Sequence, residues 1–184
     1  MKKFQIELEL RAPRAEDGYA VSELIAQCPP LDTNSEYCNL LQCTHFSGTS
    51  VAAFKRGELV GFISGYLTPE NPKNLFIWQV AVGEQARGVG LATRMLKHIL
   101  ARPYCSDVSY METSITKENE GSWALFEGVA RKLDTDLNTS IMFDKERHFQ
   151  GLHDTESLVR IGPLSDVKST RPIEVKSARP IAVA

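Results

Sequence analysis

The chain has 184 residues, of which 42% are hydrophobic and 24% are charged, and its formal net charge is −2 at pH 7. These values are ordinary for a soluble protein of one domain, and they give no reason to expect binding to nucleic acid or to an anionic membrane. No apolar run approaches the roughly 20 residues that cross a bilayer, and the charged first residues do not fit a signal peptide. We therefore expect a cytosolic protein.

The four cysteines, Cys28, Cys38, Cys43 and Cys105, form no CxxC pair, and no histidine stands at the spacing of a zinc site. We expect reduced thiols, mostly in the interior, with no disulfide framework and no bound metal. A nucleophilic cysteine needs a base held beside it, and no pattern in the sequence supplies one.

The first part of the chain predicts one strand and two helices. Residues 4–10 alternate apolar and polar side chains, as a half-buried strand does. Residues 16–27 carry apolar side chains at helical spacing, and two consecutive prolines end that helix. Capping residues at 31–35 then precede a short amphipathic helix at 37–44. The polar loop between the two helices is suited to line a cleft.

A hairpin and a central strand follow. Residues 51–54 and 59–66 predict two antiparallel strands joined by a turn that contains glycine. Residues 69–74 are polar and predict a loop. Residues 75–82 are apolar on both faces apart from Gln79, which indicates a strand in the middle of a sheet.

Next comes a glycine-bearing turn, Gln85-Ala86-Arg87-Gly88-Val89-Gly90. A helix begins near Leu91, where apolar residues recur at helical spacing until Pro103. Glycines let the backbone approach a ligand closely, and the first free amides of a helix carry partial positive charge. A strand, a glycine turn and a helix in this order form a cradle for an anion such as phosphate. The pattern is neither a GxGxxG fingerprint nor a Walker loop.

The remaining elements complete a mixed sheet. Residues 107–115 predict a strand, and a helix opens near Glu118 with its buried side formed by later apolar residues. Residues 137–144 and 158–161 predict two short strands.

The order of elements, β-α-α-β-β-β-α-β-α-β-β, indicates one α/β domain over residues 1–163 with the strand at 75–82 in its middle. Residues 164–184 contain proline and lack a helical or long strand pattern. We expect this tail to be flexible.

The glycine turn resembles the (Gln/Arg)-x-x-Gly-x-(Gly/Ala) motif of the GNAT acetyltransferase superfamily, here Gln85-x-x-Gly88-x-Gly90. Together with the element order and the later Asn119 and Phe126, the resemblance covers residues 4–163. It implies the GNAT fold, with splayed middle strands, and acetyl-CoA as co-substrate. It also implies which residues hold that co-substrate: Val80, Ala81 and Val82 on the pantetheine arm, Gln85, Ala86, Arg87, Gly88, Val89, Gly90, Leu91 and Ala92 on the pyrophosphate, and Asn119 and Phe126 on the rest of the CoA arm.

The sequence departs from the superfamily pattern at Phe126. Many members carry a tyrosine there, which protonates the departing thiolate, whereas phenylalanine has no proton to give. A thiol pKa of about 8.5 makes the CoA thiolate a tolerable leaving group. The resemblance therefore leaves the proton to come from water or from another residue such as Tyr110.

Three stretches, at residues 31–37, 77–82 and 153–157, resemble the diaminobutyrate acetyltransferases of bacterial ectoine synthesis, a response to osmotic stress. This resemblance implies that acetyl-CoA and L-2,4-diaminobutyrate give N4-acetyl-diaminobutyrate and CoA, and that the protein is a homodimer. The substrate has one carboxylate and two ammonium groups, so its site needs carboxylates for the amines and donors for the acid. The residues expected to bind it are Asp32, Asn34, Tyr37, Trp78 and Glu156.

The expected chemistry is direct attack by the 4-amine on the thioester, without an acyl-enzyme. The amine must first lose a proton, because an ammonium with a pKa near 10.4 has no free lone pair at pH 7. We expect Glu156 to be the general base, directly or through water, and His153 to be a second base or an orienting group. An amide near Val80 would polarise the thioester oxygen.

Other interpretations stay open from the sequence. Asp32 and Asn119 also fit plain capping roles, Glu156 fits a solvated surface, and Trp78 fits the core. At the level of function, the alternatives are a non-catalytic acyl-CoA-binding sensor, which the missing tyrosine favours, and an acetyltransferase for another small amine or a peptide N-terminus.

Overall fold

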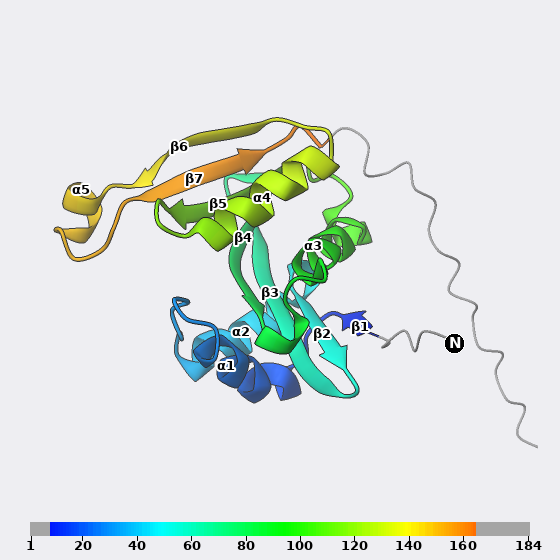
Figure 1. Ribbon diagram of the computed structural model, residues 1–184. Helices are drawn as coiled ribbons and strands as arrows, with labels where there is room; N and C mark the ends of the chain where they lie inside the picture. The colour runs from blue at the N-terminus through cyan, green and yellow to red at the C-terminus, as the bar shows by residue number, and fades with distance from the viewer. Residues whose placement is uncertain (1–7, 165–184) are drawn as a thin grey trace, which may run out of the picture.

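The computed structural model describes residues 8–164. They form one seven-stranded sheet with helices on both faces (Figure 1). The strands are β1 (Leu8–Arg11), β2 (Val51–Lys55), β3 (Glu58–Thr68), β4 (Asn71–Val82), β5 (Tyr110–Thr116), β6 (Leu137–Phe143) and β7 (Glu156–Ile161). The helices are α1 (Gly18–Ala26), α2 (Glu36–Thr44), α3 (Leu91–Leu100), α4 (Glu120–Lys132) and α5 (Lys145–Phe149).

The strands lie in the order β1-β2-β3-β4-β5-β7-β6. Every neighbouring pair is antiparallel except β4 and β5, which are parallel. The predicted mixed α/β fold is therefore confirmed, with α5 as an element that the sequence patterns did not predict.

Two hydrophobic clusters hold the layers together. On one face α1 packs on β2, β3 and β4 through Val21, Ile25, Phe62 and Ala81. On the other face α3 and α4 cover the sheet in a larger cluster. Its members include Leu91, Met95, Leu96 and Ile99 of α3, Phe126 and Val129 of α4, and Ile63, Leu75 and Ile77 of the sheet. The apolar rows predicted for the helix after residue 91 are thus its buried side.

Strand β4 begins earlier than predicted. Residues 69–74 were expected to form a loop because they are polar, but Asn71 already pairs with Thr68 and Asn74 pairs with Tyr110. The Asn74 side chain is buried, and its Nδ2 donates to Oε1 of Glu112 at 3.0 Å. A buried amide with a carboxylate partner is stable inside a sheet, so polarity alone was a wrong guide to this segment.

A β-bulge interrupts the pairing of β3 with β4. Gln79 pairs with Ser64 and Ile77 pairs with Gly65, so Trp78 is the extra residue. Leu75 and Ile77 belong to the cluster under α3 and α4, and after the bulge Val80 and Val82 pack against that same cluster. The alternation of faces is therefore shifted by one position, and Trp78 and Gln79 both turn to the face opposite α3 and α4.

The sheet opens between β4 and β5. Their parallel pairing covers only residues 74–77 and 110–113. Beyond that point β4 continues along β3 as far as Val82, and β5 continues along β7 as far as Thr116. In Figure 1 the β5–β7–β6 half extends away from the other half and carries α5 at its far end. The splayed middle strands expected from the resemblance are confirmed.

Smaller differences concern the ends of elements. The strand predicted for 107–115 begins at Tyr110, and the one predicted for 158–161 begins at Glu156. The N-terminal strand, predicted for 4–10, is described as β1 from Leu8, and its first residues lie outside the described part. The tail from residue 165 to residue 184 lies outside the described residues as well.

The cysteines are free thiols, and Cys28, Cys43 and Cys105 are buried, as expected. Burial raises the pKa of the Cys43 thiol to about 11, so this sulfur stays protonated at neutral pH. Within residues 8–164, no three metal-ligating side chains are grouped to hold an ion. None of the helices there has the length and apolar character to cross a membrane.

Candidate active site

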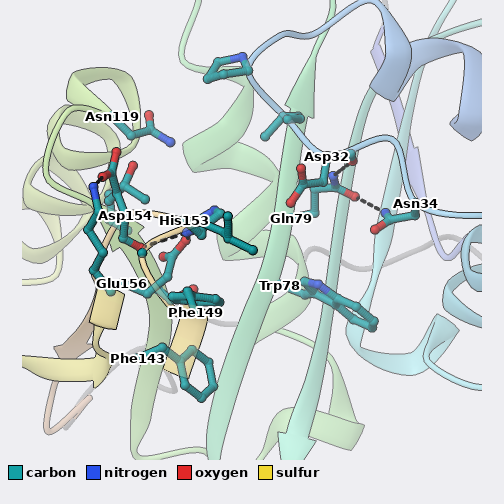
Figure 2. A pocket seen from close by; sticks show the side chains of 18 residues that line it. Asp32, Asn34, Trp78, Gln79, Asn119, Phe143, Phe149, His153, Asp154 and Glu156 are labelled. Atoms are coloured by element: carbon teal, nitrogen blue, oxygen red, sulfur yellow. Dashed lines mark hydrogen bonds and ion pairs between the residues drawn. The ribbon is translucent and has the colours of Figure 1, made fainter. Parts of the chain in front are cut away.

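The opening between β4 and β5 is the floor of a cavity of about 650 Å³. One wall comes from the loop before α2 and from β4, and the other comes from β5, the start of α4 and the connection between β6 and β7 (Figure 2). The lining residues are Pro30, Leu31, Asp32, Asn34, Trp78, Gln79, Ser114, Ile115, Thr116, Asn119, Phe143, Lys145, Phe149, Gly151, Leu152, His153, Asp154 and Glu156.

Gln79 fixes the loop that carries Asp32. Its Nε2 donates to the Asp32 carbonyl oxygen at 2.7 Å, and its Oε1 accepts from Asn34 Nδ2 at 2.9 Å. Asn34 has a left-handed backbone (φ 57°), which asparagine tolerates, and its amide also reaches Asn39 Oδ1 at 3.2 Å. The fully buried Asn39 in turn donates to Ser22 Oγ at 2.8 Å. The bulge therefore places a buried amide where it holds the loop against β4.

Trp78 lies on the same wall of the cavity as this loop. Because of the bulge it faces the cavity, and 46% of its surface is exposed, unlike that of its neighbours on β4. Its ring meets Tyr66 edge-on with centroids 6.4 Å apart. Burial, and then the Glu112 carboxylate, raise the pKa of Tyr66, so its hydroxyl stays neutral. An exposed indole over a cavity supplies apolar area and a free N–H for a ligand.

The connection between β6 and β7 folds back as a strap, which we define as residues 144–155. Two contacts join the start of the strap to its end. The Lys145 backbone N donates to Thr155 Oγ1 at 3.0 Å, and Lys145 Nζ lies 3.0 Å from Asp154 Oδ1. Inside the strap, the rings of Phe149 and His153 contact each other at a tilt of 42°, with centroids 4.7 Å apart. The strap supplies six of the residues that line the second wall.

Glu156 stands at the first position of β7, opposite Thr116 of β5. Only 18% of its side chain is exposed, and its Oε1 lies 3.9 Å from His153 Nε2. His153 Nδ1 is 2.7 Å from the Asp154 carbonyl oxygen, which fixes the proton on Nδ1 and leaves Nε2 as an acceptor in the neutral ring. A carboxylate and an imidazole thus point into the cavity together.

The structure brings Asp32, Asn34, Trp78, His153 and Glu156 to one cavity, with the first three on the wall opposite the last two (Figure 2). Tyr37 was expected there too. It lies in the first turn of α2 with 71% of its surface exposed, and it is not among the lining residues.

The free edge of β4 presents backbone groups to the opening. Gly83 N donates to the Val60 carbonyl oxygen at 2.9 Å, so this pair of positions is hydrogen-bonded in the ladder. Hydrogen-bonded and non-hydrogen-bonded pairs alternate, so Val80 and Val82 direct their N–H and C=O groups away from β3. The Val82 carbonyl accepts from Cys28 Sγ at 3.5 Å and Arg87 Nε at 3.0 Å, which leaves the groups of Val80 for a ligand.

The glycine turn has the geometry of an anion cradle. Gly88 and Gly90 both have φ near +75°, which glycine adopts without strain, and a Cβ at either position would meet no protein atom within 4 Å. Gly90 is the N-cap of α3 and supplies no side-chain cap, so the first amides of this ten-residue helix are not capped by it. The Arg87 guanidinium uses one N–H on Val82 and keeps others for an anion.

Asn119 combines the two roles considered for it. Its Oδ1 accepts from Ser122 N at 3.1 Å and so caps α4, and the residue also lines the cavity. Its amide nitrogen is then available to a ligand.

Two expectations are corrected. Phe126 was expected on the CoA arm, but it is only 2% exposed inside the cluster that joins α4 to the sheet, so its role is packing. Tyr110 was considered as a proton source, but Ser114 is the first β5 residue on the cavity, roughly 13 Å further along the strand. The Tyr110 ring instead lies under the Arg160 guanidinium, 3.9 Å from its central carbon.

Sequence reasoning missed Gln79 and the strap residues Lys145, Phe149 and Asp154. For Gln79 a signal existed, because a single amide in an otherwise apolar strand needs a specific partner. For the strap, no local sequence pattern marks a site, because only the folded sheet brings its residues opposite the loop before α2.

Known protein families and related sequences agree with this geometry. Residues 18–129 match the acetyltransferase (GNAT) family. The L-2,4-diaminobutyric acid acetyltransferase of Methylotuvimicrobium alcaliphilum is 59% identical over 88% of this chain and 94% of its own length. That of Vibrio cholerae is 51% identical over 82% of this chain and 87% of its own length.

A solved structure gives a similar result. The diaminobutyrate acetyltransferase of Paenibacillus lautus, in complex with its substrate L-2,4-diaminobutyric acid and coenzyme A, superposes with a TM-score of 0.83. It is 36% identical and covers 88% of this chain and 98% of its own. With its splayed sheet, its glycine cradle and these relatives, the chain belongs to the GNAT family of acetyltransferases and, within it, to the L-2,4-diaminobutyric acid acetyltransferases.

Proposed function

We propose that this protein transfers the acetyl group of acetyl-CoA to the 4-amino group of L-2,4-diaminobutyrate, the acetylation step of ectoine synthesis under osmotic stress. The observation that supports it best is the cavity at the splay of β4 and β5, where Asp32 and Glu156 stand on opposite walls beside Trp78. A diamine carries positive charge at both ends, and two separated carboxylates match it.

The co-substrate fits the groups on the other side of the splay. The outward backbone groups of Val80 pair with the amide-rich pantetheine arm as an added strand would, with Ala81 and Val82 beside it. The turn from Gln85 to Ala92, with Arg87, holds the pyrophosphate, because free amides, open glycines and a cation all favour phosphate oxygens. Asn119 contacts the arm through its amide. The co-substrate supplies an activated acetyl thioester.

The amine side orients the acceptor. Asp32 binds one ammonium, Trp78 packs on the carbon chain, and Asn34 supports the loop through Gln79. Glu156 receives a proton from the 4-ammonium, directly or through a water molecule, with His153 beside it as orienting group or second base.

The acetyl transfer then needs no acyl-enzyme. The neutral amine attacks the thioester carbon, and the Val80 N–H, which faces the opening, stabilises the negative charge that develops on the oxygen. The C–S bond breaks, the sulfur leaves as a thiolate, and the nitrogen, which is cationic after the attack, releases its second proton to water. Because Phe126 is buried and Tyr110 is distant, water protonates this sulfur.

A thiol-release assay tests the proposal. Purified protein with acetyl-CoA is offered diaminobutyrate, ornithine, lysine or a peptide with a free N-terminus. We expect diaminobutyrate to give the highest kcat/KM and mass spectrometry to find the acetyl group on N4. Acetyl-CoA binding without turnover of any amine would favour the sensor interpretation. Preference for the peptide would favour a peptide acetyltransferase.

We also propose that the protein is cytosolic and, from the family resemblance, that it is a homodimer. Light scattering of the purified protein at several concentrations measures the mass, for which we expect twice that of one chain. A mass equal to one 20.5 kDa chain at all concentrations would contradict this part.

A further inference from the structure

The charged residues of the cavity are unequal in sign. Three carboxylates line it, those of Asp32, Asp154 and Glu156, whereas Lys145 is the one lysine or arginine among the lining residues. Asp32 makes no ion pair within the described part of the chain. A substrate carboxylate that entered this cavity without a cation beside it would be repelled by all three.

Lys145 is held where it can meet such a carboxylate. It is the first residue of α5, and its backbone N is fixed by Thr155 Oγ1 at 3.0 Å. The preceding Asp144 caps the same helix by accepting from the N–H groups of Glu146 and Arg147. The position of Lys145 therefore depends on backbone contacts, not on its own charge.

The ion pair of Lys145 with Asp154 is exposed enough to be shared. The Nζ–Oδ1 distance is 3.0 Å, and the two side chains are 45% and 65% exposed. A pair of this kind contributes little net stability, and the ammonium keeps two further N–H donors. A second carboxylate can therefore bind to Nζ at small cost.

We infer that Lys145 binds the α-carboxylate of the acceptor and so makes the enzyme select a diamino acid over a plain diamine. This inference rests on the proposed function. Asp32 and Glu156 then take the two amino groups, and Lys145 takes the carboxylate. Each charge of the substrate meets an opposite charge, supplied by the loop before α2, the strap or the first residue of β7.

Two substrates separate the carboxylate contact from the contacts of the amines. 1,3-Diaminopropane is diaminobutyrate without its carboxylate, so it carries both amines at the same separation. It cannot use Lys145 and leaves the Lys145–Asp154 pair as it stands. The ratio of kcat/KM for diaminobutyrate to that for diaminopropane therefore isolates the carboxylate contact.

The experiment measures this ratio for the wild-type enzyme and four variants. Lys145→Met keeps the apolar stem and removes the charge, and Lys145→Arg keeps the charge. Asp154→Asn breaks the same ion pair but leaves the ammonium. Lys132→Met, an exposed position at the end of α4, is the matched control.

We expect Lys145→Met to lower the ratio roughly 10- to 100-fold, the effect of one lost charge-assisted hydrogen bond, mainly through the KM for diaminobutyrate. Lys145→Arg, Asp154→Asn and Lys132→Met should each retain the ratio within about threefold.

Other results would contradict the assignment of Lys145. If Lys145→Met slows both amines equally, or if Asp154→Asn lowers the ratio as much as Lys145→Met does, the pair only closes the strap and Lys145 does not recognise the carboxylate. A wild-type enzyme that acetylates both amines equally would also overturn the assignment while the acetyltransferase proposal survives. No acetylation of diaminobutyrate at all would overturn the proposed function and this assignment with it.

Discussion

Glu156 joins two features that a general base needs. It is largely shielded from water, and it lies at the mouth of the splay, 3.9 Å from His153 Nε2. Replacing it by glutamine preserves size and hydrogen bonding but removes the proton acceptor.

We expect Glu156→Gln to lower kcat by about 10²- to 10⁴-fold with little change in acetyl-CoA affinity. The pH dependence of kcat should also change in the variant, because its proton acceptor is gone. Glu127→Gln on the exposed side of α4 is the control. A variant with normal kcat and an unchanged pH profile would remove Glu156 from the mechanism.

Gly88 offers a second test at the scale of one residue. Its φ is +75° and its missing side chain faces open space, where we place the pyrophosphate. Gly57, in the β2–β3 turn, has a similar φ of +84° and equally open surroundings but lies far along the chain from the cradle.

Alanine at either glycine should cost similar stability, about 1 kcal/mol, because both force a left-handed backbone on a residue with a Cβ. Only Gly88→Ala should weaken acetyl-CoA binding, measured by calorimetry, since its methyl group enters the cradle. Equal affinities in the two variants would show that the turn does not hold the phosphates.

Among the elements, the loop before α2 is held to β4 by Gln79 more than by its own conformation. Asn74 lies on the same strand and is equally buried, at 7% exposure, but its amide serves Glu112 and stands outside the cavity. Variants of these two residues can therefore separate a loss of stability from a loss of positioning of the Asp32 loop.

We expect Gln79→Met and Asn74→Leu to lower the free energy of unfolding by comparable amounts, about 1–3 kcal/mol, because each leaves buried partners unsatisfied. Gln79→Met alone should raise the KM for diaminobutyrate, since Asp32 loses its support. Urea unfolding and steady-state kinetics measure the two effects. A similar rise in KM for both variants would contradict a positioning role for Gln79.

Whether the sequence predicted an element depended on how far apart in the chain its contacting residues lie. Helix α3 and the cradle before it were predictable because their signals, helical period and glycine spacing, are local. The start of β4 was not, since Asn74 is stable there only through Glu112 from a strand much later in the chain. Gln79 escaped notice for the same reason, because Asp32 and Asn34 meet it only in the folded protein. Lys145 escaped notice because no local pattern marks the strap as part of a site.

On the scale of the whole molecule, the first strand is joined to the helical layer by an ion pair. Asp17 accepts from Arg11 Nη1 and Nη2 at 2.7 and 2.8 Å and from the Arg14 backbone N at 2.7 Å. The Arg11 hydrogen bonds hold the pKa of the Asp17 carboxyl below its ordinary value. A lowered pKa means that the pair stabilises the fold when Asp17 is ionised.

The stabilising effect should be present above about pH 4 and be lost as the pH falls through the lowered pKa of Asp17. Asp17→Asn should therefore reduce the free energy of unfolding at pH 7 by about 1.5–3 kcal/mol. The difference from wild type should shrink as the pH is lowered from 5 to 2. Urea titrations across that range measure it, and a constant difference would contradict the linkage.

Different parts of the chain build the donor side and the acceptor side of the site, which bears on how the amine specificity of such enzymes evolves. The thioester side is built from β4 and the turn before α3, whereas the strap at residues 144–155 adds Lys145, His153 and Asp154 to the acceptor side. A strap is a connection between two strands, and connections accept insertions and replacements that a sheet does not. A new amine specificity can therefore arise by exchange of one hairpin connection, with the acetyl donor machinery inherited intact.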